Sequence, residues 1–337
     1  MRKLLLTFAA VLTLSAVQAE DGHRLWMRYD LAKTAQVEAP AGSPTISIAK
    51  GELENYYQGS HVMLRLDPSL PDDDGFTIKG DDDQLTITAR HDIGLLYGAY
   101  EVLRLQATDI PIADEAQQPK FKLRLLNHWD NLDGSIERGY AGESIFEWFH
   151  LDEQLIRDYA RANASIGING SVLNNVNASP KILTKPYLQE VKKIADILRP
   201  YGIRVFLSIN FATPMALGQT KTADPKDGKV SRWWRNKARE IYRLIPDFGG
   251  FLVKANSEGQ PGPGDYHRTH ADGANMLADA LAPYNGIVMW RCFVYGANHK
   301  GEDRVKQAVS EFKPLDGKFR KNVRSEEHTS ELQSHLN

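Results

Sequence analysis

The chain has 337 residues, of which 42% are hydrophobic, and its 41 basic and 43 acidic residues leave a formal net charge of −2. This length exceeds one average domain and this apolar fraction supports a sizeable core, so two domains are expected. The charges are spread along the chain, which argues against nucleic acid or a membrane as partner. Neutral or polar small molecules are the favoured ligands.

The N-terminal stretch MRKLLLTFAAVLTLSAVQAEDG begins with two cations and continues as an apolar run that ends in small residues at Val17 and Ala19. This pattern is typical of a secretory signal peptide, and the run is too short to span a bilayer. We expect residues 1–19 to be a signal peptide, with cleavage after Ala19 and export to the periplasm or the medium.

Residues 20–118 mix short strands with one helix. The stretches HVMLRLD (61–67) and QLTITARHD (84–92) alternate apolar and polar residues, as half-buried antiparallel strands do. The stretch DIGLLYGAYEVLRLQ (92–106) has apolar residues at helical spacing, which predicts an amphipathic helix on the sheet. The pattern predicts a small N-terminal α/β domain, and ADEAQQPK (113–120) is expected to be a linker.

From residue 119 to 323 the pattern becomes strand then helix, repeated. Apolar strands linked by helices indicate a parallel sheet, and the even spacing without a Gly-rich nucleotide loop favours a (β/α)8 barrel over a doubly wound sheet. The fold class is therefore α/β, with an incomplete barrel of about five of its eight strands. The predicted strands are FKLRLLNHW (121–129), GINGSVLNN (167–175), IRVFLSIN (203–210), GGFLVKAN (249–256) and GIVMWRCFVY (286–295), and FRKNV (319–323) resembles the start of a sixth.

In such a barrel the functional groups lie where strands end and loops begin. Amides hydrogen-bond sugar hydroxyls, an indole stacks on a pyranose, and paired cations hold a carboxylate, so these strand ends suit a sugar that carries an acid group. The residues concerned are His128, Trp129, Asp130, Asn131, Asn174, Asn175, Asn177, Asn210, Lys254, Asn256, Glu258, Trp290 and Arg291.

Each candidate also has a purely structural interpretation. Glu258 could be a surface carboxylate, Lys254 and Arg291 could pair with acidic residues at the same rim, and Trp129 could be core packing. Adjacent Trp233 and Trp234 lie on a predicted helix and are expected to pack there. Asp265, His267 and His270 have a spacing that could contact a metal, but no third histidine completes a set, so neither metal nor cofactor is expected.

The last residues, RSEEHTSELQSHLN (324–337), break abruptly from apolar periodicity to a polar, patternless tail. This string is similar to the conceptual translation of a sequencing adapter. We therefore expect residues 324–337 to be non-native, and we expect the natural protein to continue differently after Val323.

Three long motifs carry a resemblance to a known family: LLNHWDNLDGSIERGYAG (125–142), GFLVKANSEGQPGPGDYHRTHADGANMLADAL (250–281) and GIVMWRCFVY (286–295). With the segment GLLYGAYEVLRLQ (94–106), they resemble the α-glucuronidases of glycoside hydrolase family 67. The resemblance extends from Glu20 to Val323.

The resemblance implies hydrolysis, with inversion and without a metal, of the α-1,2 bond between glucuronic acid, or its 4-O-methyl ether, and the terminal xylose of xylan fragments. It places the general acid at Glu258, the carboxylate-binding residues at Lys254 and Arg291, and a sugar subsite at Trp129 and Val176, beside the Asn175 amide. It also allows a homodimer of the full-length protein. We expect partial burial to raise the pKa of Glu258, as proton donation at neutral pH requires.

Inversion requires a second carboxylate, about 6.5–9.5 Å from the acid, to activate water. The family places this group on strands beyond the fifth, together with a helical C-terminal domain, and the chain contains neither. We therefore expect this chain to be inactive. The alternative from another class is a non-catalytic acidic-sugar-binding protein, which would use Lys254, Arg291 and Trp129 without Glu258.

Overall fold

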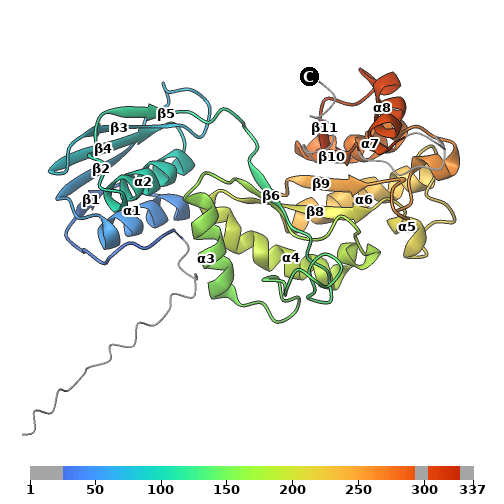
Figure 1. The fold of residues 1–337 in the computed structure, drawn as a ribbon, viewed down its shortest axis with the longest axis horizontal. Helices are drawn as coiled ribbons and strands as arrows, with labels where there is room; N and C mark the ends of the chain where they lie inside the picture. Colours follow the sequence, from blue (N-terminus) through green and yellow to red (C-terminus); the bar gives the residue numbers. More distant parts are fainter. Residues whose placement is uncertain (1–25, 293–302, 327–337) are drawn as a thin grey trace, which may run out of the picture.

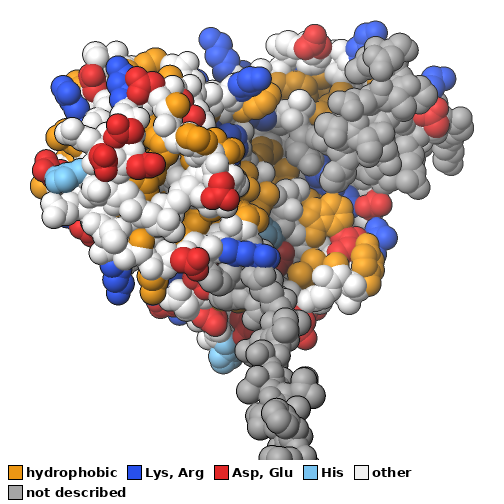
Figure 2. Space-filling view, turned by 60° about the vertical axis from the view of Figure 1, so that its left-hand side comes forward, with side chains coloured by type: hydrophobic (Ala, Val, Ile, Leu, Met, Phe, Trp, Pro, Cys, Tyr) orange, Lys and Arg blue, Asp and Glu red, His pale blue; other side chains and the backbone are white. Residues whose placement is uncertain are grey.

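The computed structural model describes residues 26–292 and 303–326. The predicted signal peptide and residues 327–337 of the predicted adapter-derived tail lie outside these ranges. Among the described residues, no helix is both long and apolar enough to cross a membrane. On the face shown in Figure 2, acidic and basic side chains are interspersed rather than gathered into a field of one sign.

The N-terminal part is a five-stranded mixed sheet in the order β1-β2-β4-β3-β5. Helices α1 (Pro44–Tyr56) and α2 (Asp92–Ala107) pack against each other beside this sheet (Figure 1). Its core includes the buried side chains of Leu53, Ile87 and Leu96. The strands are β1 (Gln36–Glu38), β2 (His61–Leu66), β3 (Phe76–Gly80), β4 (Gln84–Ala89) and β5 (Glu115–Gln117).

Three expectations for this part were wrong. β2 and β4 are parallel neighbours, not an antiparallel pair, because β3 turns back on the other side of β4. Helix α1 was not predicted, although Ser43 accepts a hydrogen bond from the Ile46 amide and caps it. The expected linker 113–120 contains β5, which extends the sheet through β3. The domain boundary near residue 118 stays a prediction.

The second sheet has six parallel strands in the order β11-β10-β9-β8-β7-β6, and it curls into part of a barrel (Figure 1). A strand lies within each of the five predicted segments, although residues 293–295 of the last segment lie outside the described residues, and the segment predicted to open a sixth strand leads into β11. This strand includes Arg324–Glu326 of the predicted tail. The bounds are β6 (Leu125–Asn127), β7 (Gly170–Val172), β8 (Arg204–Asn210), β9 (Gly250–Lys254), β10 (Ile287–Arg291) and β11 (Val323–Glu326).

Helices connect these strands, as parallel pairing requires. Side-chain caps begin several of them: Asp152 accepts from two backbone amides at the start of α3, and Thr269 and Asp272 form a reciprocal capping box at α7. Trp234 on α6 is fully buried against Phe251, as expected for a packing residue. The helices are α3 (Glu153–Ala164), α4 (Lys185–Leu198), α5 (Thr213–Ala216), α6 (Gly228–Leu244), α7 (His270–Leu281) and α8 (Arg304–Phe312).

The two faces of the parallel sheet hold different side chains. On the outer face, Leu207, Phe251 and Val288 belong to the large core that packs against the helices. On the inner face, successive strands place Val172, Phe206, Leu252 and Met289 in a smaller apolar cluster. Because side chains alternate along a strand, the next inner-facing residues toward the carboxyl ends are polar. These residues are Asn174, Ser208, Lys254 and Arg291.

Candidate active site

The end of β9 positions the central pair of the site. Lys254 is the last residue of β9, and Asn256 and Glu258 follow it with left-handed backbone φ angles of 53° and 49°. The Asn256 side chain faces its own loop, where its Oδ1 accepts from the Gly264 amide at 2.9 Å. A Cβ at Gly262 would lie 2.3 Å from that oxygen, which explains the glycine. The Gly/Pro-rich loop therefore wraps around Asn256 and directs Glu258 back over Lys254.

The Lys254 ammonium group is buried and has two partners. It is 2% exposed, donates to Asn177 Oδ1 at 2.8 Å and forms a salt bridge with Glu258 Oε2. The Glu258 side chain is 38% exposed. The sequence prediction that these residues lie together at the strand ends is consistent with this geometry, and so is the structural alternative that Lys254 pairs with a rim carboxylate.

The Lys254 hydrogen bond lowers the pKa of Glu258, and its charge and those of Arg138 and Arg291 add to this effect, against a smaller opposing contribution from burial. The expectation of a raised pKa is wrong for the free protein, because the net shift is downward although burial alone acts in the expected direction. Partial exposure keeps the desolvation penalty small, and the ammonium group of Lys254 is in direct contact.

Arg138 and Glu137 were not identified from the sequence as site residues. Arg138 Nη2 lies 3.8 Å from Glu258 Oε1, and Arg138 Nε lies 3.6 Å from Glu137 Oε1, so one guanidinium faces two carboxylates. Glu137 has a left-handed φ of 57°, and its backbone carbonyl accepts from the side-chain amides of Asn131 and Asn175. The signal available in the sequence was a charged pair inside the glycine-rich loop that follows the first barrel strand.

Arg291 at the end of β10 and Trp129 just after β6 lie next to each other at the rim. Arg291 ends β10 and is 3% exposed, and its guanidinium carbon lies 5.9 Å from the centroid of the Trp129 ring. Trp129 is partly buried and packs on the inner apolar cluster, which fits the packing role considered for it, while its contact with a sugar stays a prediction. A cation beside an indole face is a favourable electrostatic contact.

Asn175 and Val176 are buried at the end of β7. The Asn175 side-chain NH₂ donates to the Trp129 and Glu137 carbonyls at 3.2 and 3.3 Å, and its Oδ1 accepts from the Asn177 amide at 2.9 Å. Val176 is 2% exposed within the inner cluster. In the free protein both side chains support the rim, and their predicted contact with a sugar is not tested by this geometry.

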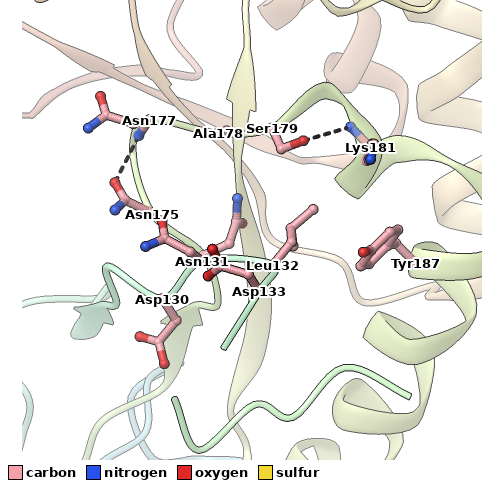
Figure 3. A pocket seen from close by; sticks show the side chains of 11 residues that line it. Asp130, Asn131, Leu132, Asp133, Asn175, Asn177, Ala178, Ser179, Lys181 and Tyr187 are labelled. Atoms are coloured by element: carbon pink, nitrogen blue, oxygen red, sulfur yellow. Dashed lines mark hydrogen bonds between the residues drawn. The ribbon is translucent and has the colours of Figure 1, made fainter. Parts of the chain in front are cut away.

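A cavity of about 380 Å³ adjoins this cluster and shares Asn177 with it. Figure 3 shows Asn175 and Asn177 on one side of the cavity and Lys181 and Tyr187 on the other. Its lining is rich in amides, hydroxyls and carboxylates, with one aromatic ring, which suits a polyol better than an apolar ligand. The lining residues are Asp130, Asn131, Leu132, Asp133, Asn174, Asn175, Asn177, Ala178, Ser179, Lys181 and Tyr187.

His270, one of the two histidines considered for a metal, has other side-chain contacts. His270 Nδ1 accepts from the Trp290 indole N–H at 3.1 Å, and its Nε2 lies 2.8 Å from Glu311 Oε2, which fixes the Nε2–H tautomer if the ring is neutral. His267 ends a short 3₁₀ turn with a left-handed φ of 56°. Within 26–292 and 303–326, no three His, Cys, Asp or Glu side chains gather as a metal site would require.

Comparison with known proteins identifies the family of the chain. The family model described as the glycosyl hydrolase family 67 middle domain matches residues 104–326. The chain belongs to glycoside hydrolase family 67. Relatives include the probable alpha-glucuronidase A of Aspergillus fumigatus, 47% identical over 87% of this chain and 36% of the relative. That of Aspergillus niger is 40% identical over 93% of this chain and 43% of the relative. The family 67 chain thus spans about two fifths of the length of these relatives.

Solved structures of other families share the fold with this family 67 chain. A β-N-acetylhexosaminidase from Bacteroides fragilis superposes with a TM-score of 0.54 at 12% identity, over 88% of this chain and 66% of that one. A GH138 enzyme targeting pectin rhamnogalacturonan II gives 0.53 at 15% identity, over 87% of this chain and 38% of that one. At these identities the likeness concerns the fold alone.

Proposed function

We propose that the whole protein to which this sequence belongs is an exported α-glucuronidase. It hydrolyses, with inversion, the α-1,2 bond between glucuronic acid, or its 4-O-methyl ether, and the terminal xylose of xylan fragments. The observation that carries the proposal is the cluster at the ends of β9 and β10, where Glu258 contacts the buried Lys254 and lies close enough to Arg291 to be influenced by its charge. Membership of family 67 and the names of the curated relatives support the same reading.

Each residue has a defined part in this mechanism. Lys254 and Arg291 hold the uronate carboxylate, the Trp129 ring packs on the sugar, and Asn175 and Val176 shape the subsite wall. Glu258 donates a proton to the departing xylose oxygen as the glycosidic bond breaks. The polar cavity beside Asn177 offers hydroxyl-binding groups next to this position.

We also propose that this chain alone does not turn over substrate. Inversion needs a second carboxylate that activates water on the opposite face of the sugar, and such positioned base catalysis contributes about 10²–10⁴-fold. Glu137, a second carboxylate at the described rim, shares Arg138 with Glu258, and its backbone carbonyl anchors the Asn131 and Asn175 side chains. We assign it a role in supporting the loop.

The test has a binding part and a catalytic part. The chain should bind D-glucuronate in calorimetry without releasing it from uronosyl xylo-oligosaccharides, and Lys254→Met should lose at least about tenfold in affinity, as expected for a charge-assisted contact worth more than 1.4 kcal/mol. In the full-length protein, Glu258→Gln should abolish turnover of uronosyl-xylose substrates and spare aryl uronides with good leaving groups. Equal loss on both substrates would rule out the acid role, and turnover by the chain itself would contradict its inactivity.

A non-catalytic acidic-sugar-binding protein remains the second candidate, since the Lys254, Arg291 and Trp129 cluster serves it equally well. It is distinguished by a full-length protein that binds glucuronate and hydrolyses no uronoside.

A further inference from the structure

The geometry of the free site favours the ionised form of Glu258, which cannot donate a proton. A general acid must carry a proton when the bond breaks, yet Glu258 is paired with the Lys254 ammonium group, and that contact favours the ionised carboxylate. The proposed mechanism therefore needs an event that separates these two groups before chemistry.

The surroundings of Lys254 indicate what could separate it from Glu258. Its ammonium group is almost fully buried and already contacts one neutral oxygen, on Asn177, and one carboxylate, on Glu258. A second carboxylate brought to the same ammonium group would stand close to Glu258, and two like charges at such a distance disfavour the ionisation of both. Of the two existing partners, Glu258 is the one on an exposed side chain, so it can move away.

We infer that a uronate carboxylate exchanges with Glu258 on Lys254, and that Glu258 takes up a proton from solvent as the sugar binds. This inference deepens the proposed function and rests on it. The ligand's carboxylate accepts the hydrogen bond that Glu258 gives up, and no covalent bond changes. The charge that marks the sugar as an acid thus also prepares the proton donor.

The other charged groups around Glu258 set how complete the uptake is. Among the described residues these are Arg138 on the loop after β6 and Arg291 on β10, with Glu137 facing Arg138 from the same loop. Arg138 opposes protonation of Glu258, but its side chain is 66% exposed and its contact is 3.8 Å long, so solvent screens it. Arg291 is expected to turn toward the bound anion. Replacing Arg138 with Gln should therefore increase the uptake.

The experiment is calorimetric titration of D-glucuronate into the chain between about pH 5 and 8, where the ligand stays ionised, in buffers of different ionisation enthalpy. The expected result is uptake approaching one proton per ligand, with affinity falling by up to about tenfold per pH unit over the pH range in which that uptake is measured. Glu258→Gln should take up no proton, bind with an affinity independent of pH, and exceed the wild type in affinity at neutral pH because the internal competitor is gone. D-glucose, which lacks the carboxylate, should cause no uptake.

The outcomes separate this inference from the proposed function. Glucuronate binding that depends on Lys254 but takes up no proton, with Glu258→Gln no tighter than wild type, would overturn the exchange and leave the carboxylate site intact. If neither the wild type nor Glu258→Gln binds glucuronate, or if Lys254→Met binds it as tightly as the wild type, the proposed carboxylate site itself is overturned. Unfolding curves of each variant confirm that the comparison is made between folded proteins.

Discussion

The contact between α1 and α3 supports a quantitative prediction about what joins the N-terminal sheet to the barrel. Glu52 on α1 is 8% exposed. Its two carboxylate oxygens accept hydrogen bonds from Nε and Nη2 of Arg161 on α3, the latter at 2.7 Å. The Arg161 guanidinium carbon lies 5.1 Å from the centroid of the Tyr56 ring, and the Tyr100 hydroxyl donates to the same carboxylate at 3.4 Å. Removing one partner of such a buried pair leaves an uncompensated charge.

Arg161→Met should therefore lower the free energy of unfolding by about 3–5 kcal/mol. Urea unfolding followed by circular dichroism measures this, and an unchanged slope against denaturant would show that stability itself has changed. The matched control is Arg157→Met on the same helix, where an exposed i,i+4 pair with Glu153 is expected to contribute no more than about 0.5 kcal/mol.

Replacing both Glu52 and Arg161 by Met should recover a large share of the loss, because no buried charge is then left without a partner. The reasoning would be refuted if Arg161→Met cost no more than Arg157→Met. It would also fail if the double variant lost as much as the two single variants together.

Two further predictions concern the sheet and the site. Gly250 has a φ of 140°, and a Cβ there would lie 1.9 Å from the Ile287 carbonyl oxygen. Gly250→Ala should therefore lower the free energy of unfolding in urea by about 3 kcal/mol or more. The control Gly228→Ala, which has open space around it, should be neutral or stabilising. Lys254 lowers the pKa of Glu258 in the folded protein below its ordinary value of 4.5, so the pair stabilises the fold above pH 4.5, and this stability is lost as the pH falls through the folded-state pKa. Glu258→Gln should flatten this part of an acid-unfolding profile. An unchanged profile would contradict the pairing.

The parallel sheet could be predicted because each apolar strand is followed by a helix long enough to return the chain to the same end. The arrangement of the N-terminal sheet could not. Alternation of apolar and polar residues reports that β2 and β4 are half-buried, but it carries no information about their relative direction. Helix α1 contains β-branched residues and Gly51, which weaken the apolar helical pattern, although Ser43 followed by Pro44 was a readable start signal.

The sequence allowed prediction of those site residues that lie at the carboxyl ends of strands. Lys254, Glu258, Trp129 and Arg291 were placed at one rim because parallel strands bring their carboxyl ends together, and the contacts are consistent with that placement. Arg138 was missed because it lies on an irregular loop, where no periodicity fixes the direction of a side chain. The direction of the Glu258 pKa shift was also out of reach, because it depends on two left-handed residues that fold the carboxylate back onto Lys254.

The layering of the inner face explains why a costly pair of cations is found at this end of the strands. Phe206, Leu252 and Met289 fill the part of the inner face that precedes these cations along the strands, and their apolar side chains offer no partner for a buried charge. One step further along the strands, loops return over the sheet and provide Asn177 to Lys254 and the Trp129 ring to Arg291. Placing ammonium and guanidinium groups there still costs desolvation energy, which a well-packed apolar pair would avoid. Keeping these cations beneath the exposed carboxylate of Glu258 therefore makes the fold less stable than it could be. An incoming anion recovers part of that difference as binding energy only to the extent that it pairs with the cations better than Glu258 does.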